Sequence, residues 1–125
     1  MHTIVVVNDE PNILEIVQSL LAAQGYGVRA FAHGAEALVA LGKAPADLVI
    51  TDASNHPMSG VELVRRLRHL TDVPVIFLSA WAEDVEEQLR GTELAAQGYV
   101  ELPFSTDQLL QVVERALAPR PAIET

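Results

Sequence analysis

The sequence predicts an α/β domain with a parallel sheet that is covered by helices on both faces. Two observations lead to this prediction: five short apolar runs recur along the chain, and each is followed by a segment with helical periodicity. Strands that are apolar on both faces, joined by short connections to helices, are typical of parallel sheets. With 125 residues, 50% of them hydrophobic, the chain has room for one such domain.

The strands are predicted from apolar runs bounded by turn-forming residues. Most of these runs lack the polar alternation of a sheet with one wet face, and the second run is the weakest. The predicted strands cover residues 3–8, 27–31, 47–51, 74–78 and 98–102.

The first two helices are delimited by turn-forming residues. Residues 11–24 place apolar side chains on one helical face, with Pro11 near the start and Gly25 just past the end. Residues 35–41 are predicted to be helical and to stop near Gly42.

The last three helices are defined by different signals. Apolar residues at helical spacing indicate a helix over about 60–70. Residues 84–97 combine an acidic outer face with a thin apolar face, so we expect this helix to be the least firmly docked. The final helix begins with a capping box at Ser105–Gln108 and ends near Leu117.

These elements predict a flavodoxin-like doubly wound fold, with a five-stranded parallel sheet in the order 2-1-3-4-5 and five helices. The domain is expected to cover residues 1–118. Residues 119–125 contain two prolines and read as a flexible C-terminal tail.

Composition excludes several classes of function. A formal net charge of -9 argues against direct binding to nucleic acid and predicts that charged partners are basic. The absence of cysteine excludes disulfides and thiolate metal sites. No apolar run has the length of a membrane span, and the first residues lack the pattern of a signal peptide. We therefore expect a cytoplasmic protein without a membrane partner.

Polar side chains stand at the ends of three predicted strands. Asn8 and Asp9 follow the first strand, Asp52 follows the third and Ser79 follows the fourth. In an open parallel sheet the carboxyl ends of the strands converge on one crevice, so these side chains are expected to lie together. No glycine-rich phosphate loop follows any strand, which argues against a dinucleotide or P-loop site.

The sequence resembles the receiver domain of two-component response regulators over about residues 3–117. The resemblance rests on the order of five segments rather than on any one of them. They are IVVVNDEPNI, DLVITD, Gly60 eight residues after Asp52, the LSA of the fourth strand, and Pro103-Phe104 after the fifth strand.

The resemblance implies a phosphoryl-transfer site. Asp52 would be the phosphoacceptor, receiving its phosphoryl group from a phosphohistidine of a sensor histidine kinase or a phosphotransfer protein. Mg²⁺ would be ligated by Asp9, Asp52 and the backbone carbonyl of Ser54, with Asn8 contributing weakly through a water molecule. The resemblance allows Mg²⁺-dependent self-phosphorylation on Asp52, and no turnover of a separate substrate is expected.

The resemblance also implies a switch. Ser79 would sense the phosphoryl group by a hydrogen bond, and Tyr99 would swing inward as the switch aromatic. Their movement would reshape the face built from helix 84–97, strand 98–102 and the final helix. The family resemblance also allows a homodimer through this face.

Two positions depart from the family pattern. Asn8 replaces the first acidic residue, and Leu102 replaces the lysine that normally precedes Pro103. The two replacements leave the formal charge of the pocket unchanged, so attraction of Mg²⁺ is expected to survive in weakened form. Loss of the ammonium predicts impaired phosphorylation or switching.

Other interpretations stay open at this point. One is a phosphorylation-independent interaction module that uses the acidic face of helix 84–97, and another is a magnesium-dependent phosphatase with an aspartate nucleophile. Asp9 could act only on a helix dipole, Ser79 could be an ordinary strand-end hydroxyl, and Tyr99 could be a fixed core aromatic. Trp81 is either a partner-binding anchor or packs against the fourth helix.

Overall fold

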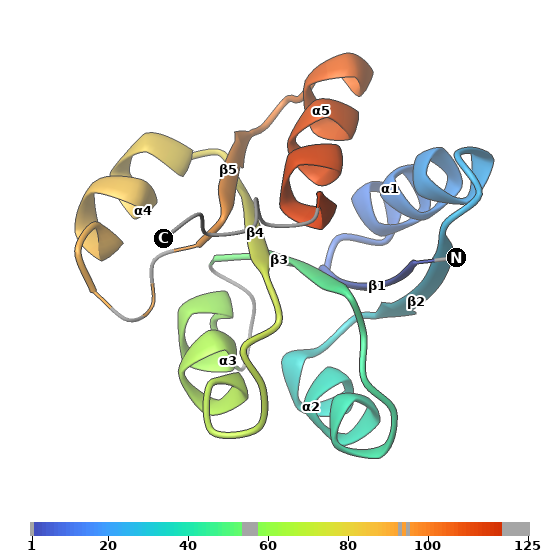
Figure 1. Ribbon diagram of the computed structural model, residues 1–125. Coiled ribbons are helices and arrows are strands. Elements are labelled where there is room, and N and C mark those ends of the chain that lie inside the picture. The colour runs from blue at the N-terminus through green and yellow to red at the C-terminus, as the bar shows by residue number, and fades with distance from the viewer. Residues whose placement is uncertain (1, 54–57, 93, 95, 119–125) are drawn as a thin grey trace, which may run out of the picture.

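The computed structural model describes residues 2–53, 58–92, 94 and 96–118. In these ranges the chain forms one parallel sheet in the order β2-β1-β3-β4-β5, which confirms the predicted fold class (Figure 1). The strands are β1 (Thr3–Val7), β2 (Gly27–Phe31), β3 (Leu48–Asp52), β4 (Val75–Ser79) and β5 (Gly98–Glu101). The helices are α1 (Pro11–Ala23), α2 (Gly34–Lys43), α3 (Gly60–Leu67), α4 (Ala82–Leu89) and α5 (Thr106–Leu117).

The sheet separates two hydrophobic cores, because successive side chains of a strand point to opposite faces. On β1, Ile4 and Val6 pack with α1 and α5, whereas Val5 and Val7 pack with α2, α3 and α4. Figure 1 shows the same division, with α1 and α5 together on one side of the strands. Burial on both faces explains why the strand sequences are continuously apolar.

The predicted helix over 84–97 is wrong at its C-terminal end, because α4 stops at Leu89. Arg90 leaves the helical conformation with ψ 131°, and Gly91 follows with φ 78°. A positive φ is readily adopted by glycine, so the chain turns here. The hydroxyl of Thr92 then donates to the Leu89 carbonyl oxygen at 2.6 Å and closes the helix end.

The other helix boundaries differ little from the prediction. α3 is shorter than predicted and ends at Leu67, whereas α2 continues through Gly42 to Lys43. The Ser105 hydroxyl accepts the Gln108 N–H at 3.1 Å, which confirms the predicted cap of α5. Within the described ranges, no helix combines the length and apolarity needed to span a membrane.

Candidate functional site

The carboxyl ends of three neighbouring strands bring the candidate residues to one edge of the sheet. Val7 of β1 pairs with Thr51 of β3, and Asp52 pairs with Leu78 of β4. Asn8 and Asp52 therefore lie at corresponding positions at the ends of β1 and β3, and Ser79 lies one residue beyond the partner of Asp52 on β4. Neighbouring strands are about 4.8 Å apart in a parallel sheet. Ligand sites in this fold class lie at this edge.

Asp52 is the last residue of β3 and is half-buried. Gly60, the first residue of α3, lies so close that a Cβ there would overlap the carbonyl oxygen of Asp52. The Gly60 N–H also donates to the Ala53 carbonyl oxygen at 3.0 Å. The glycine eight residues after Asp52 thus allows α3 to pack directly against the end of the acceptor strand.

Asn8 is 1% exposed and is anchored by its oxygen. The Oδ1 atom accepts the Glu10 N–H at 2.9 Å. Nδ2 is buried and has no hydrogen-bond partner in the part of the chain that the structure describes. Asp9, the next residue, is exposed.

The donor set at this edge suits a hard divalent cation only in part. Asp9 and Asp52 offer carboxylate oxygens, the ligands that Mg²⁺ prefers. Asn8 is less suitable, because Oδ1 is already bound by Glu10 and the remaining atom is a hydrogen-bond donor. No group of three or more acidic or histidine side chains suited to a metal is found in the described residues. Ser54, the third predicted ligand, lies outside those residues.

Ser79 ends β4 and is 3% exposed. Its hydroxyl oxygen accepts the Trp81 N–H at 3.0 Å, and its carbonyl oxygen accepts the Leu102 N–H at 3.0 Å. The residue therefore contacts both the start of α4 and the end of β5. A change in the Ser79 hydrogen bond would be felt first at Trp81, which is 69% exposed.

Tyr99 is held at both ends of its side chain. The ring stacks on Phe77, with centroids 6.0 Å apart and an interplanar angle of 23°. The hydroxyl oxygen accepts the Ala96 N–H at 2.9 Å. Ala96 precedes β5, whereas Ser79 pairs with Glu101 at the other end of that strand. The hydroxyl is therefore directed away from Ser79, and the predicted inward swing would have to break this bond.

Leu102 contributes to an apolar groove instead of a charged pocket. The groove has a volume of about 520 Å³ and lies between α1 and the segment that joins β5 to α5. Leu102 belongs to the core cluster on the α1 and α5 side of the sheet, and its peptide bond to Pro103 is cis. The groove is lined by Ile13, Ile16, Leu20, Leu102, Pro103, Phe104 and Thr106.

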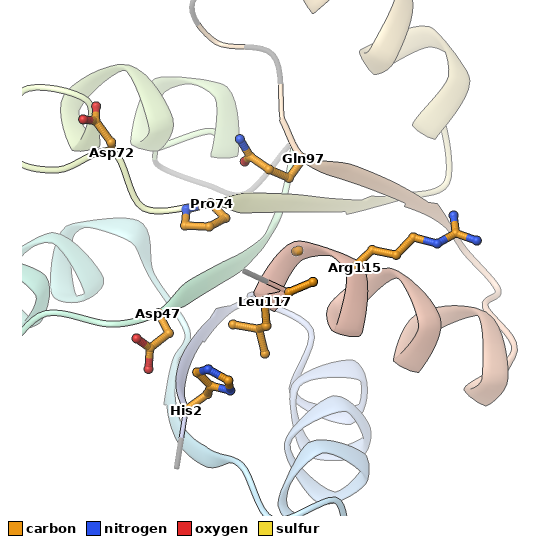
Figure 2. Close-up of a pocket in the computed structure, with 9 residues that line it drawn as sticks. His2, Asp47, Asp72, Pro74, Gln97, Arg115 and Leu117 are labelled. Carbon is orange, nitrogen blue, oxygen red and sulfur yellow. The ribbon is translucent and has the colours of Figure 1, made fainter. Parts of the chain in front are cut away.

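A second, polar cavity of about 440 Å³ lies at the opposite edge of the sheet, where the strands begin (Figure 2). Asp47 at its rim already accepts the Thr3 N–H at 2.7 Å. Figure 2 shows Asp72 and Arg115 at opposite sides of the view, so the charged groups do not converge. Because ligand chemistry in this fold class occurs at the carboxyl ends of the strands, we assign the candidate site there.

Three features of this site were not predicted from the sequence. They are the Nδ2 atom of Asn8, which has no partner among the described residues, the bond from Ala96 to Tyr99, and the outward orientation of Leu102 into an apolar groove. Only the last has a sequence signal, because strand alternation places Leu102 on the same side as Val100.

Comparisons with known proteins agree with this geometry. Residues 4–114 match the family model of the response regulator receiver domain. The chain is 36% identical over 124 residues to a probable transcriptional regulator, ycf27, of Cyanidium caldarium, covering 97% of this chain and 49% of that protein. It is 35% identical over 117 residues to the transcriptional regulatory protein KdpE of Mycobacterium tuberculosis, covering 94% and 51%.

Solved structures show the same likeness. The chemotaxis response regulator CheY4 of Vibrio cholerae superposes with a TM-score of 0.86 at 30% identity, covering 94% of this chain and 99% of that chain. A response regulator receiver domain from Clostridium thermocellum gives a TM-score of 0.84 at 25% identity, covering 94% of both chains.

Fold and strand-end site together define a signalling domain of the two-component class. The chain belongs to the response regulator receiver domain family. It spans about half the length of the curated relatives that it matches.

Proposed function

We propose that this receiver domain accepts a phosphoryl group on Asp52 from a sensor histidine kinase or a phosphotransfer protein. A carboxylate oxygen of Asp52 attacks phosphorus, the P–N bond to the donor imidazole breaks, and an acyl phosphate forms on Asp52. The observation that supports this role is the placement of Asp52 between Asn8 and Ser79 at the carboxyl edge of the sheet.

Asp9 and Asp52 would hold Mg²⁺, with the Ser54 carbonyl as a further ligand and Asn8 acting weakly through a water molecule. The cation would offset the repulsion between the Asp52 carboxylate and an anionic phosphoryl group. Asp9 is exposed and Asp52 half-buried, so the pair is accessible to an ion from solvent.

Ser79 and Tyr99 would read the modification. A hydrogen bond donated by the Ser79 hydroxyl to a phosphoryl oxygen would reorient the hydroxyl whose oxygen accepts the Trp81 N–H. Since Trp81 precedes α4, this reorientation would move the start of that helix, and Tyr99 would follow once its bond to Ala96 breaks. The output would leave through the surface formed by α4, β5 and α5.

Phosphorylation or switching would be impaired because Leu102 has no donor for the phosphoryl group. Its side chain is apolar and lines the groove beside α1. The lysine ammonium that would connect the phosphoryl group to the end of β5 is therefore missing. The variant Leu102→Lys should accelerate phosphorylation if the missing charge is the cause.

Intact-mass measurement after incubation with acetyl phosphate and Mg²⁺ tests the acceptor role. We expect slow addition of one phosphoryl group, no addition in Asp52→Asn, and faster addition in Leu102→Lys. Rapid stoichiometric addition to the unmodified chain would refute the impairment. Absence of addition in every variant would refute the acceptor role itself.

A second candidate function is a phosphorylation-independent interaction module. A groove of about 350 Å³ between α4, β5 and α5 is lined by Glu83, Glu86 and Glu101, and Trp81 nearby is 69% exposed. Exposed tryptophans are frequent anchors in interfaces, and the carboxylates would favour a basic partner. Partner binding that is equal in the unmodified chain and in Asp52→Asn would favour this function.

The wider context is also proposed. Residues 1–118 would form a cytoplasmic regulatory domain, and the output would be supplied by another segment or by a partner protein. The predicted C-terminal tail, 119–125, lies outside the residues that the structure describes. A homodimer through α4, β5 and α5 would bring the carboxylates of the groove near those of the second copy. Since like charges oppose such contact, we expect self-association through this face to be weak and to strengthen with salt.

A further inference from the structure

Asn8 has a buried amide group whose hydrogen-bonding capacity is only half used. Oδ1 accepts the Glu10 N–H at 2.9 Å, and because a backbone N–H donates only to an acceptor, this contact identifies the oxygen. Nδ2 is then the other terminal atom, and it finds no partner among the residues that the structure describes. The residue is 1% exposed, so bulk solvent does not reach the amide.

Strand geometry places this amide beside Asp52. Val6 pairs with Ile50, and both belong to the core on the α1 and α5 side of the sheet. Asn8 and Asp52 each follow two residues later, so pleating puts their side chains on that same side, one strand spacing apart. The Asn8 N–H still donates to Phe31 of β2 at 3.1 Å, so β1 keeps its position for this additional residue.

An acceptor oxygen at this place would satisfy the amide, whereas a cation would not. A buried donor without an acceptor is unfavourable because it has lost its hydrogen bonds to water. An N–H group carries positive partial charge, so it repels a metal ion and attracts an anionic oxygen. The amide therefore suits a group that adds oxygens to Asp52.

We propose that the Nδ2 group of Asn8 donates a hydrogen bond to a phosphoryl oxygen on Asp52. It would thereby supply part of the stabilisation that Leu102 cannot. The amide of Asn8 would strengthen binding of the phosphoryl group, whereas a carboxylate at this position would strengthen binding of Mg²⁺. The inference rests on the proposed acceptor role of Asp52.

Two variants of the full chain separate this role from a structural one. Asn8→Asp has the same shape and keeps an oxygen for the Glu10 N–H, but it replaces the amide donor by an acceptor. Asn8→Ser also offers an oxygen to that N–H and removes the Nδ2 group without adding charge, and its single O–H donor lies closer to the backbone than Nδ2 does. Thermal unfolding of both variants would establish that they are folded.

The probes are Mg²⁺ alone and beryllium trifluoride at saturating Mg²⁺, each measured by isothermal titration calorimetry. Asn8→Ser should weaken beryllium trifluoride binding about tenfold, the effect of one charge-assisted hydrogen bond, and leave Mg²⁺ affinity nearly unchanged. Asn8→Asp should tighten Mg²⁺ binding and weaken beryllium trifluoride binding further. Opposite changes for the two ligands are not expected of a purely structural residue.

The outcomes distinguish the inference from the function on which it rests. If the unmodified chain binds beryllium trifluoride and both variants bind it equally well, the proposed hydrogen bond from Asn8 is wrong, while the acceptor role of Asp52 is still supported. If the unmodified chain does not bind beryllium trifluoride, both the acceptor role and the inference are wrong.

Discussion

Helices α3 and α4 have equal length and pack on the same side of the sheet, yet they are held differently. Each has eight residues, but α3 buries four of them and α4 buries two. α3 is capped by Ser59, whose hydroxyl accepts the Glu62 N–H at 3.0 Å, whereas α4 begins at Trp81 without a side-chain cap. Fewer buried contacts and an uncapped start indicate that α4 opens locally at a lower free energy than α3.

The difference in local stability between α3 and α4 fits the part of the candidate site that each helix adjoins. α3 packs through Gly60 against Asp52 and would keep the proposed acceptor in place. α4 follows Ser79 and Trp81 and would be displaced when the Ser79 hydroxyl reorients toward a phosphoryl group. A receiver domain that switches needs a rigid acceptor site. It also needs a neighbouring element whose conformational equilibrium shifts when that site is modified.

The largest contrast is expected from truncating one leucine in each helix. Leu67 of α3 is 0% exposed, and Leu67→Ala should lower the free energy of unfolding by about 2–5 kcal/mol. Leu89 ends α4 at 8% exposure, so Leu89→Ala should cost less and mainly increase local opening. Urea denaturation with amide hydrogen exchange measures both, and a larger global loss for Leu89→Ala would contradict the comparison.

The glycines at the two helices should respond differently to a methyl group. In Gly60→Ala the Cβ would overlap the backbone of Asp52, and the required shift should cost about 1–3 kcal/mol. Gly91, just after α4, has φ 78° and open space around it, so Gly91→Ala should cost about 1 kcal/mol from backbone strain alone. Denaturation midpoints would compare them, and equal losses would mean that α3 does not pack tightly on Asp52.

Removing the N-terminal cap of α3 and adding one to α4 should narrow the difference in stability between the two helices. Ser59→Ala removes the only side-chain bond to the first turn of α3 that the structure describes, and should cost about 1 kcal/mol. Trp81→Asp places a capping carboxylate before α4 and should slow amide exchange in that helix. A cap at Trp81 that leaves exchange in α4 unchanged would show that another interaction limits its opening.

The smallest effect concerns pH. Hydrogen bonds from Arg66 and Arg65 hold the pKa of the Glu62 carboxyl below its usual value. Because the pKa is lower in the folded state, this stabilisation is present above the unfolded pKa and is lost as pH falls through the folded one. The structure describes no ion pair of this kind on α4. Acidification should therefore destabilise α3 slightly more than α4, and Glu62→Gln should abolish this difference. Amide exchange against pH measures it, and the exposed position keeps it small.

The fold could be predicted because its signals are local. Apolar runs, turn residues and the Ser105 cap each act within a few residues, and the five strands lie within one residue of their predicted ranges while the cap of α5 is formed. The end of α4 was mispredicted because residues that favour helices follow Gly91 in the sequence, whereas the chain turns at that glycine. The backbone conformation of a glycine outweighed the helix propensity of its neighbours there.

The site could be predicted only as far as strand ends define it. Parallel strands bring Asn8, Asp52 and Ser79 to one edge whatever the side chains do. The partners of those side chains depend on rotamers and on neighbouring loops, which periodicity does not report. Two such features are the bond from Ala96 to Tyr99 and the Nδ2 atom of Asn8, which has no partner in the part of the chain that the structure describes.

Residue-resolved NMR of the full chain with Mg²⁺ and beryllium trifluoride most directly tests whether Asp52 is the acceptor and α4 the responding element. We predict that amide shifts change at Asp9, Asp52 and Ser79 and extend through Trp81 into α4, while α3 beyond Gly60 changes little. Shifts that are confined to α3, or that avoid the carboxyl edge of the sheet, would contradict the account.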